Sequence, residues 1–585
     1  MSPISSGTGR RAFLGGTGGL LFGSPLLSAC GEGSGSATRE ITLTIDWLDT
    51  TLGGEAVRLR AYNGSVPGPT LTVDPGDVLQ IVIENRLTAY DSSEWSGDHN
   101  VPHALNTTNL HLHGMDVTPH LFDPLGTDDP GASMIAIGPG ESFAYTFEIP
   151  ADHPPGLYWY HSHHHGSTVV QAVSGMAGPI VVRGAIDEVP EIAAARDVLT
   201  VLSDIGLFPA DNGDDRWIYQ PRQNAIWSTF PLMIGGATGN VWTYDASAAE
   251  GKRLLDLQGG YTTGDYRLRF YAVNGAPYYR EDHNDGDDPT SPLGTALSPM
   301  TLSLRPGEVI RLRILNACSD LVMPLTIAGL DMHLIALDGT NFGAPRRLTT
   351  VEPTSWDGKV HYDAGATTLV LAPANRAEVL IRGGAPGTYE LVQAGHTGQQ
   401  FLAANRKVIA IMTVEGEAMD MSLPAVLPEP SRRYPLITAE QIVQERRLEF
   451  MGMFPAKNNL QLGIDFMLAV GAGTMNPVSA AYDEHVINTS VSVETAEAWT
   501  LSAPTHDGGN EEGHPFHIHV NPFEVKAIDG VPQPPGTYMD TLWIGKQQTA
   551  LAWLRFIEWT GKTVYHCHIL PHEDSGMMHN LMIKG

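Results

Sequence analysis

The chain has 585 residues, which is too long for one hydrophobic core and predicts about three or four domains. It is rich in glycine and proline, only 17% of its residues are charged, and no long helical periodicity is visible, so strands and turns are favoured over helices. Its formal net charge of -30 argues against nucleic acid as a partner.

Residues 1–38 have the features of an export signal followed by a flexible tether. Arg10 and Arg11 begin a sequence typical of twin-arginine export, and a glycine-rich apolar stretch follows them. This stretch is too short and too interrupted by glycine for a permanent transmembrane span. It ends at Cys30, in a Leu-Ser-Ala-Cys sequence similar to the lipobox of bacterial lipoproteins. We predict export to the periplasm or cell surface with a lipid anchor at Cys30, the alternative being an ordinary cleaved signal.

A pattern of strand, turn and alternating strand occurs three times along the chain, at 71–85, at 302–316 and, in a weaker form, at 491–501. A glycine-led strand follows in each repeat, at 156–161, 387–392 and 561–566. Alternation with a period of two and turns of this kind predict three β-sandwiches of related sequence. We place their boundaries near residues 186 and 424, which defines a first unit (39–186), a middle unit (187–424) and a last unit (425–585).

The strongest chemical signal lies near the end of the chain, where Cys567 stands between His566 and His568. Alternate residues of a strand point to opposite faces, so the two histidines project to one side and Cys567 to the other. His572 and Met577 can meet Cys567 on its own side. Two histidines, one cysteine and a weak axial methionine form a blue-copper electron-transfer site, so one imidazole must come from elsewhere. His566 and His568 would hold a second metal centre a few covalent bonds away.

Three more histidine clusters lie upstream, and with the Cys567 segment they read HLHG (111–114), HSH (161–163), HPFHIH (514–519) and HCHILPHEDSGM (566–577). In these motifs and their order the sequence resembles the multicopper oxidase family of laccases, ascorbate oxidases and bacterial copper-tolerance oxidases. The resemblance covers nearly the whole mature chain and is to the three-domain, laccase-like bacterial type. It implies an all-β fold of three consecutive cupredoxin-like Greek-key β-sandwich domains.

The resemblance also implies four bound copper ions. The blue type 1 copper would be held by His514, Cys567, His572 and Met577, and the type 2 copper by His111 and His517. The binuclear type 3 pair would be held by His113, His161, His163, His519, His566 and His568. The middle unit has no histidine pair at the matching place, so we interpret it as a spacer, with the second centre between the first and last units.

Oxygen reduction also needs protons, and two carboxylates are candidates for delivering them. The resemblance implies this role for Glu573, which directly follows a copper ligand. For the second acid, expected after HLHG, we predict Asp128, with Asp123 as the alternative. The competing interpretation of both acids is a surface or turn carboxylate. His164 and His165 extend the HSH cluster and are interpreted as supporting groups rather than ligands.

These sites predict an oxidase that takes single electrons from a small reductant at the blue copper and reduces O₂ to water. Methionine-rich segments collect cuprous ions in copper-tolerance oxidases, but here the methionines are only scattered, at Met451, Met453, Met467 and Met475. We therefore favour phenols or aromatic amines as reductants, followed by cuprous or other metal ions. A copper-sequestering surface lipoprotein is a further alternative, whereas the eight histidines of the second centre argue against a copper nitrite reductase.

Overall fold

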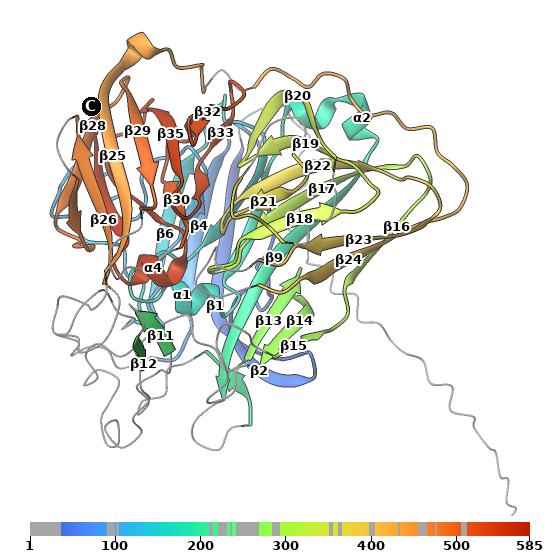
Figure 1. Ribbon diagram of the computed structural model, residues 1–585. Helices are drawn as coiled ribbons and strands as arrows, with labels where there is room; N and C mark the ends of the chain where they lie inside the picture. Colours follow the sequence, from blue (N-terminus) through green and yellow to red (C-terminus); the bar gives the residue numbers. More distant parts are fainter. Residues whose placement is uncertain are drawn as a thin grey trace, which may run out of the picture.

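The computed structural model describes residues 37–89, 100, 104–209, 215–219, 231–234, 237–240, 268–282, 293–349, 355–360, 366–396, 404–430, 433–453, 465–473, 477–504 and 512–585. The described chain consists mainly of strands, which confirms the all-β prediction (Figure 1). The predicted export signal and the Cys30 anchor lie outside the described residues. No helix within the described ranges has the length and apolar character needed to cross a membrane.

The first unit folds as two facing sheets around a core of alternating apolar residues. One sheet contains β1 (Thr38–Leu52), β2 (Glu55–Tyr62), β4 (Val78–Asn85) and β6 (Ser142–Glu148), and the other has the order β3 (Leu71–Val73), β8 (Ala177–Val182), β7 (Gly156–His161), β5 (His111–His113). Along β4 every second residue is buried, as the sequence pattern predicts. Short helices follow β7 and β8, namely α1 (Thr168–Ala172), η1 (Ala185–Glu188) and α2 (Pro190–Ala193).

The middle unit shares a sheet with the first. Strand β9 (Arg196–Pro209) pairs with β17 (Val309–Asn316) in the middle unit, and through β10 (Trp217–Ile218) it connects to β2. The path of this sheet runs β20-β19-β22-β17-β9-β10-β2-β1-β4-β6. Its further strands are β19 (Met332–Leu337), β20 (Thr340–Leu348), β22 (Arg376–Arg382), β13 (Leu268–Val273), β14 (Ala276–Asp282) and β15 (Leu293–Ala296). The sequence predicted three consecutive β-sandwiches but gave no sign that two of them share a sheet.

The second sheet of the middle unit contains β16 (Met300–Leu304), β18 (Met323–Ile327), β21 (Leu369–Leu371), β23 (Gly387–Gln393) and β24 (Lys407–Val414). A separate hairpin is formed by β11 (Pro231–Ile234) and β12 (Ala237–Asn240). Cys318 is buried in the apolar core of this unit, as expected for a small core residue.

The last unit again has two sheets. The first has the order β27 (Val478–Ala480), β26 (Asp465–Ala472), β25 (Ile442–Met453), β29 (Ala496–Ser502), β35 (Thr549–Arg555), β31 (Phe523–Ile528), β32 (Val531–Pro532). In the same sheet β33 (Tyr538–Met539) pairs with β31. The short helix η3 (Ala439–Gln441) precedes β25. The second has the order β28 (Ile487–Ser492), β37 (Met578–Lys584), β36 (Gly561–Cys567), β30 (His514–Ile518), β34 (Thr541–Ile544).

The first and last units meet at two short helices. Helix α4 (Leu570–Asp574) of the last unit packs against α1 of the first, and Figure 1 shows the two side by side. The Asp574 carboxylate accepts hydrogen bonds from the backbone N–H groups of Gly166 (2.8 Å) and Val169 (2.9 Å), the latter in the first turn of α1. This contact brings the segment after β36 against the segment after β7, and both segments carry predicted copper ligands.

Two of the glycines that begin the repeated strands lie where the backbones of different units touch. A Cβ atom on Gly156 would lie 2.7 Å from the Cα of Gly339, and one on Gly561 would lie 2.7 Å from the backbone carbon of Gly126. The equivalent glycine of the middle unit, Gly387, is exposed, and its Cβ would meet nothing closer than 3.9 Å. The glycines of the outer repeats therefore allow close packing between units.

Replacing Gly156 with alanine tests this packing. We expect G156A to force apart the backbones of the first and middle units and to destabilise the protein by about 1–3 kcal/mol, the usual cost of overpacking. The apparent Tm measured by thermal unfolding should fall by several degrees, whereas G387A should leave it nearly unchanged. An equal effect of the two substitutions would contradict the close approach.

Candidate metal centre

Three polar side chains converge on one face of strand β36. Cys567 Sγ lies 3.5 Å from His514 Nδ1 and 3.6 Å from His572 Nδ1, and all three residues are buried. Pairing of β30 with β36 brings His514 near Cys567, and α4 carries His572 back toward it. Met577 is fully buried, and its backbone oxygen accepts a hydrogen bond from Cys567 N (3.0 Å). The structure thus brings together the imidazole, thiolate and second imidazole predicted for the blue site.

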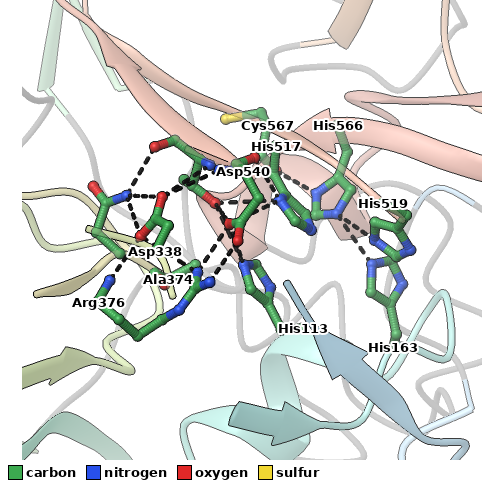
Figure 2. A network of polar contacts seen from close by, with 12 residues as sticks. His113, His163, Asp338, Ala374, Arg376, His517, His519, Asp540, His566 and Cys567 are labelled. Atoms are coloured by element: carbon green, nitrogen blue, oxygen red, sulfur yellow. Dashed lines mark hydrogen bonds and ion pairs between the residues drawn. The ribbon is translucent and has the colours of Figure 1, made fainter. Parts of the chain in front are cut away.

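Eight histidines gather on the opposite face of the same strand, and all are buried. Their nitrogens form three groups that could each hold a metal ion: His111, His113 and His517; His113, His161 and His568; and His163, His519 and His566. In the last group, His566 Nε2 lies 3.1 Å from His163 Nε2 and 3.2 Å from His519 Nε2 (Figure 2). The eight histidines come from the first and last units, between which the second centre is predicted.

Hydrogen bonds fix which nitrogen each imidazole turns toward the group. A carbonyl oxygen can only accept, so Nδ1–H donates from His161 to Ser162 O (2.8 Å), from His517 to Asp540 O (2.8 Å) and from His566 to Cys567 O (3.0 Å). In a neutral ring the remaining Nε2 then carries a lone pair. For His161 and His517 this Nε2 is buried without a hydrogen-bond partner among the described residues. Buried acceptors with no protein partner are the expected mark of metal ligands, so these residues fit copper.

Burial also sets the charge of the cluster. Removal from water lowers the pKa of His161 to about 4 and that of His566 to about 3. These imidazoles are therefore neutral at pH 7, which is the form that binds a metal. Burial raises the pKa of the Cys567 thiol, so bound metal is needed to favour the thiolate.

One buried histidine beside the cluster was not predicted. His120 Nε2 accepts a hydrogen bond from the backbone N–H of Leu112 (3.0 Å), and its Nδ1 donates to Thr118 O (3.0 Å). Because His120 Nε2 must accept, the neighbouring His111 Nδ1 (3.2 Å) must donate to it. This leaves His111 Nε2 free to face the cluster. A histidine nine positions after a ligand gives no periodic signal, so the sequence alone could not assign this role.

The predicted carboxylates fall in different places. Glu573 is fully buried, with one oxygen 3.4 Å from His163 Nδ1 and the other 3.2 Å from His566 Nδ1. Asp128 and its alternative Asp123 are exposed, because the chain stays mostly buried over residues 115–122 and reaches the surface at residue 123. The second carboxylate beside the cluster is instead Asp540, which lies 3.0 Å from His113 Nε2 and comes from the last unit. The acid in contact with His113 thus belongs to the last unit, and not to the segment after HLHG where the second acid was expected.

The other histidines near HSH have structural contacts. His164 O accepts a hydrogen bond from Ser167 N at the start of α1 (2.9 Å), and His165 Nε2 lies 3.1 Å from Asn100 Oδ1.

Of the methionines singled out in the sequence, Met451 and Met467 lie opposite each other on the paired strands β25 and β26. The neighbouring Phe450 stacks on His514, so strand alternation directs Met451 to the opposite face. The side chain of Met453 and the whole of Met475 lie outside what the structure describes.

A β fold that buries a His-Cys-His site beside an eight-histidine cluster defines a copper protein with cupredoxin-like domains. Comparison with known families agrees: three multicopper oxidase models match residues 45–186, 242–417 and 455–585. The chain belongs to the multicopper oxidase family. It is accordingly a copper-dependent oxidoreductase that uses O₂ as electron acceptor and binds four copper ions, of types 1, 2 and 3.

Curated relatives carry several names. Multicopper oxidase MmcO of Mycobacterium tuberculosis is 24% identical over 92% of this chain and 85% of its own length. Copper resistance protein A of Escherichia coli is 26% identical over 51% of this chain and 42% of the relative, and Laccase-4 of Thanatephorus cucumeris is 26% identical over 62% and 64%.

Two solved structures share the fold. A multicopper oxidase from Campylobacter jejuni, described as a metallo-oxidase, superposes with a TM-score of 0.61 at 22% identity over 96% of this chain and 94% of that one. The laccase-like CueO from Ochrobactrum sp., described as active on lignin model compounds, gives a TM-score of 0.62 at 20% identity over 94% and 99%.

The role of His120 can be tested against a matched residue. His153 is buried with the same bonding pattern, accepting from Asp116 N (3.1 Å) and donating to Pro154 O (3.0 Å), but its ring packs against Tyr158 and not against a histidine of the cluster. We expect H120A to weaken retention of the copper predicted at His111 and His517 about 10- to 100-fold, and H153A to retain it. The copper content of each variant after dialysis against increasing concentrations of a chelator measures this retention. Equal copper loss in both variants would show a general loss of stability instead.

Proposed function

We propose that this protein oxidises small phenols or aromatic amines one electron at a time, coupled to reduction of O₂ to two molecules of water. The observation that carries the proposal is the placement of Cys567 between His566 and His568, with the His514–Cys567–His572 group on one face of β36 and the histidine cluster on the other. Four such one-electron oxidations, with four protons, balance the reduction of one O₂.

We assign the copper ligands from the resemblance to the family, and the groups of converging nitrogens support this assignment. His514, Cys567, His572 and Met577 would hold the type 1 copper, and His111 and His517 the type 2 copper. The type 3 pair would be held by His113, His161 and His568 on one side and His163, His519 and His566 on the other, two groups whose nitrogens already converge. Bound copper supplies the one-electron redox chemistry that the protein side chains lack.

Electrons would enter on the His572 side. His572 presents Nδ1 to Cys567 and Nε2 to Glu512 Oε1, 3.1 Å away. It is also the more exposed imidazole of the pair, at 7% against 3% for His514. From Cys567 the path continues through the backbone to His566 and His568, which requires no movement of the chain.

Glu573 would supply protons to the cluster. Its two carboxylate oxygens face different imidazoles, His163 and His566, in a site closed to bulk water. A carboxyl group in this position can pass a proton inward and be reprotonated afterwards. Asp128, proposed earlier for the second acid, has no such contact because it is exposed.

Oxidation of metal ions is the second candidate, and one observation favours it. The Glu512 carboxylate, 4% exposed and in contact with His572, places an acidic group where the reductant would approach. Such a group favours a cation over a neutral phenol. The arrangement of Met451 on the face opposite Phe450 gives no corresponding support for cuprous ion in particular.

The cellular setting follows from the N-terminal sequence. We propose that the protein is exported, to the periplasm or cell surface, and held by lipid at Cys30, with residues 31–36 as the tether.

Copper sequestration is the alternative function. Catalytic O₂ consumption distinguishes it from an oxidase, because a storage protein binds copper without turnover.

Comparing reductants with and without the Glu512 charge separates the two substrate classes. We expect copper-loaded protein lacking residues 1–30 to consume O₂ faster with a methoxyphenol than with cuprous, manganous or ferrous ion. E512Q should leave KM for the neutral phenol within about twofold and raise KM for the metal ions about tenfold, equivalent to about 1.4 kcal/mol of lost attraction. Faster uptake with a metal ion would reverse the order of the two candidates, and absence of uptake with every reductant would favour sequestration.

The proton role of Glu573 is tested by E573Q, which keeps the shape of the side chain but removes the exchangeable acid. We expect O₂ turnover to slow about 10²- to 10⁴-fold, while reduction of the blue site by the phenol under anaerobic conditions keeps its rate. D128N is the control, because its side chain is exposed, and its turnover should match the unmodified protein. Full activity of E573Q would remove Glu573 from the proposal.

A further inference from the structure

A buried arginine of the middle unit reaches the histidine cluster. Arg376, the first residue of β22, is fully buried. Its Nη1 donates to Asp540 Oδ1 (2.9 Å) and its Nη2 to Asp540 Oδ2 (2.5 Å), a two-point ion pair between the middle and last units (Figure 2). Such paired bonds fix orientation as well as position, because the guanidinium fork matches the carboxylate.

Asp540 in turn contacts two predicted copper ligands. Its carboxylate oxygen Oδ1 lies 3.0 Å from His113 Nε2, and its backbone carbonyl accepts from His517 Nδ1 (2.8 Å). Thr541 Oγ1 donates to the same Oδ1 (2.9 Å). With Oδ1 as acceptor, His113 Nε2 must carry the proton. His113 Nδ1, which is buried without a hydrogen-bond partner among the described residues, is then the nitrogen available to a metal.

Arg376 is itself held rigidly. Asp338 accepts from its backbone N–H (2.8 Å), and the carbonyl oxygens of Ala374 (3.0 Å) and Leu157 (3.2 Å) accept from its side chain. Asp338 also accepts from the backbone N–H groups of Asp540 (3.3 Å) and Thr541 (3.2 Å). The backbone that carries Asp540 is therefore tied to the middle unit at several points, not through one side chain.

The glycine of the HLHG motif leaves room for this ion pair. Gly114 has a φ of +80°, a left-handed conformation, and a Cβ atom there would overlap Arg376 Nη2 and Asp540 Oδ2. Gly114 belongs to the first unit, Arg376 to the middle unit and Asp540 to the last unit. All three units thus meet at this point, one residue from His113.

We propose that Arg376 is a positioning residue for the three-copper site: it holds Asp540 so that the Asp540 carboxylate orients His113 and the Asp540 carbonyl orients His517. The inference rests on the ligand roles given to these histidines under the proposed function. The middle unit, to which none of the predicted copper ligands belongs, then contributes to copper binding through this ion pair. Lysine cannot replace arginine here, because a single ammonium group cannot make the two parallel bonds.

The test compares R376K with a matched arginine. Arg311, on β17 of the same sheet, is also buried and pairs with Glu378 (Arg311 Nε to Oε2, 2.8 Å) and with Asp187, away from the cluster. We expect R376K to bind the type 2 copper about 10- to 100-fold more weakly in chelator competition and to change its electron paramagnetic resonance signal. R311K should keep both properties, even where its Tm falls as much as that of R376K.

Two further variants make each outcome decisive. T541V removes one donor to Asp540 with little change of shape, and we expect a smaller change of the type 2 signal in the same direction. It decides the question if R376K does not fold, since an unaltered signal in T541V would then overturn the proposal. H517A tests the ligand role separately: full type 2 copper in H517A refutes the proposed assignment. If H517A loses the type 2 copper while R376K keeps both its copper affinity and its type 2 signal, the ligand assignment stands and only the positioning role of Arg376 is refuted.

Discussion

The alternation of side chains along β36 is the constraint on which the site depends. Because neighbouring residues of a strand face opposite sides, Cys567 belongs to one group of ligands while His566 and His568 belong to another. The two groups are therefore joined by the shortest covalent path that a polypeptide offers. A shift of the strand by one residue would exchange the faces and destroy both groups, so the pairing of β36 with β30 and β37 must fix the register.

The histidine cluster imposes a cost that the rest of the fold must offset. Each buried polar atom without a partner costs about 1–3 kcal/mol, and several imidazole nitrogens of the cluster are in this position among the described residues. Neutral imidazoles keep this cost below that of buried charges, and bound metal recovers it. The close backbone packing at Gly156 and Gly561 and the bonds from Asp574 to α1 hold the outer units together around the cluster.

What the sequence reveals here depends on distance along the chain. Strand geometry predicted that Cys567 and its two neighbouring histidines face opposite sides, and the composition and turns predicted an all-β fold. The grouping of the four distant motifs came from the resemblance to the family. His120, Asp540 and the shared sheet were not. The carboxylate beside His113 lies 427 residues away in the chain, and no local period links such residues. The expectation of Asp128 rested on the resemblance, which implies an acid after HLHG, but the Asp128 side chain is exposed.

The middle unit is a second case in which contacts between distant residues could not be predicted from the sequence. Its sequence has no histidine pair at the place that matches HSH and HCH, which suggested a spacer. A spacer needs only surface contact, whereas Arg376 is buried and contacts residues of both other units. A buried guanidinium is tolerated only where its charge is paired, and here the pairing carboxylate is the one that contacts His113. Stability and ligand orientation thus depend on the same ion pair. A change in the middle unit that moves Arg376 would leave a buried carboxylate unpaired directly beside a ligand, so this unit cannot vary independently of the copper site.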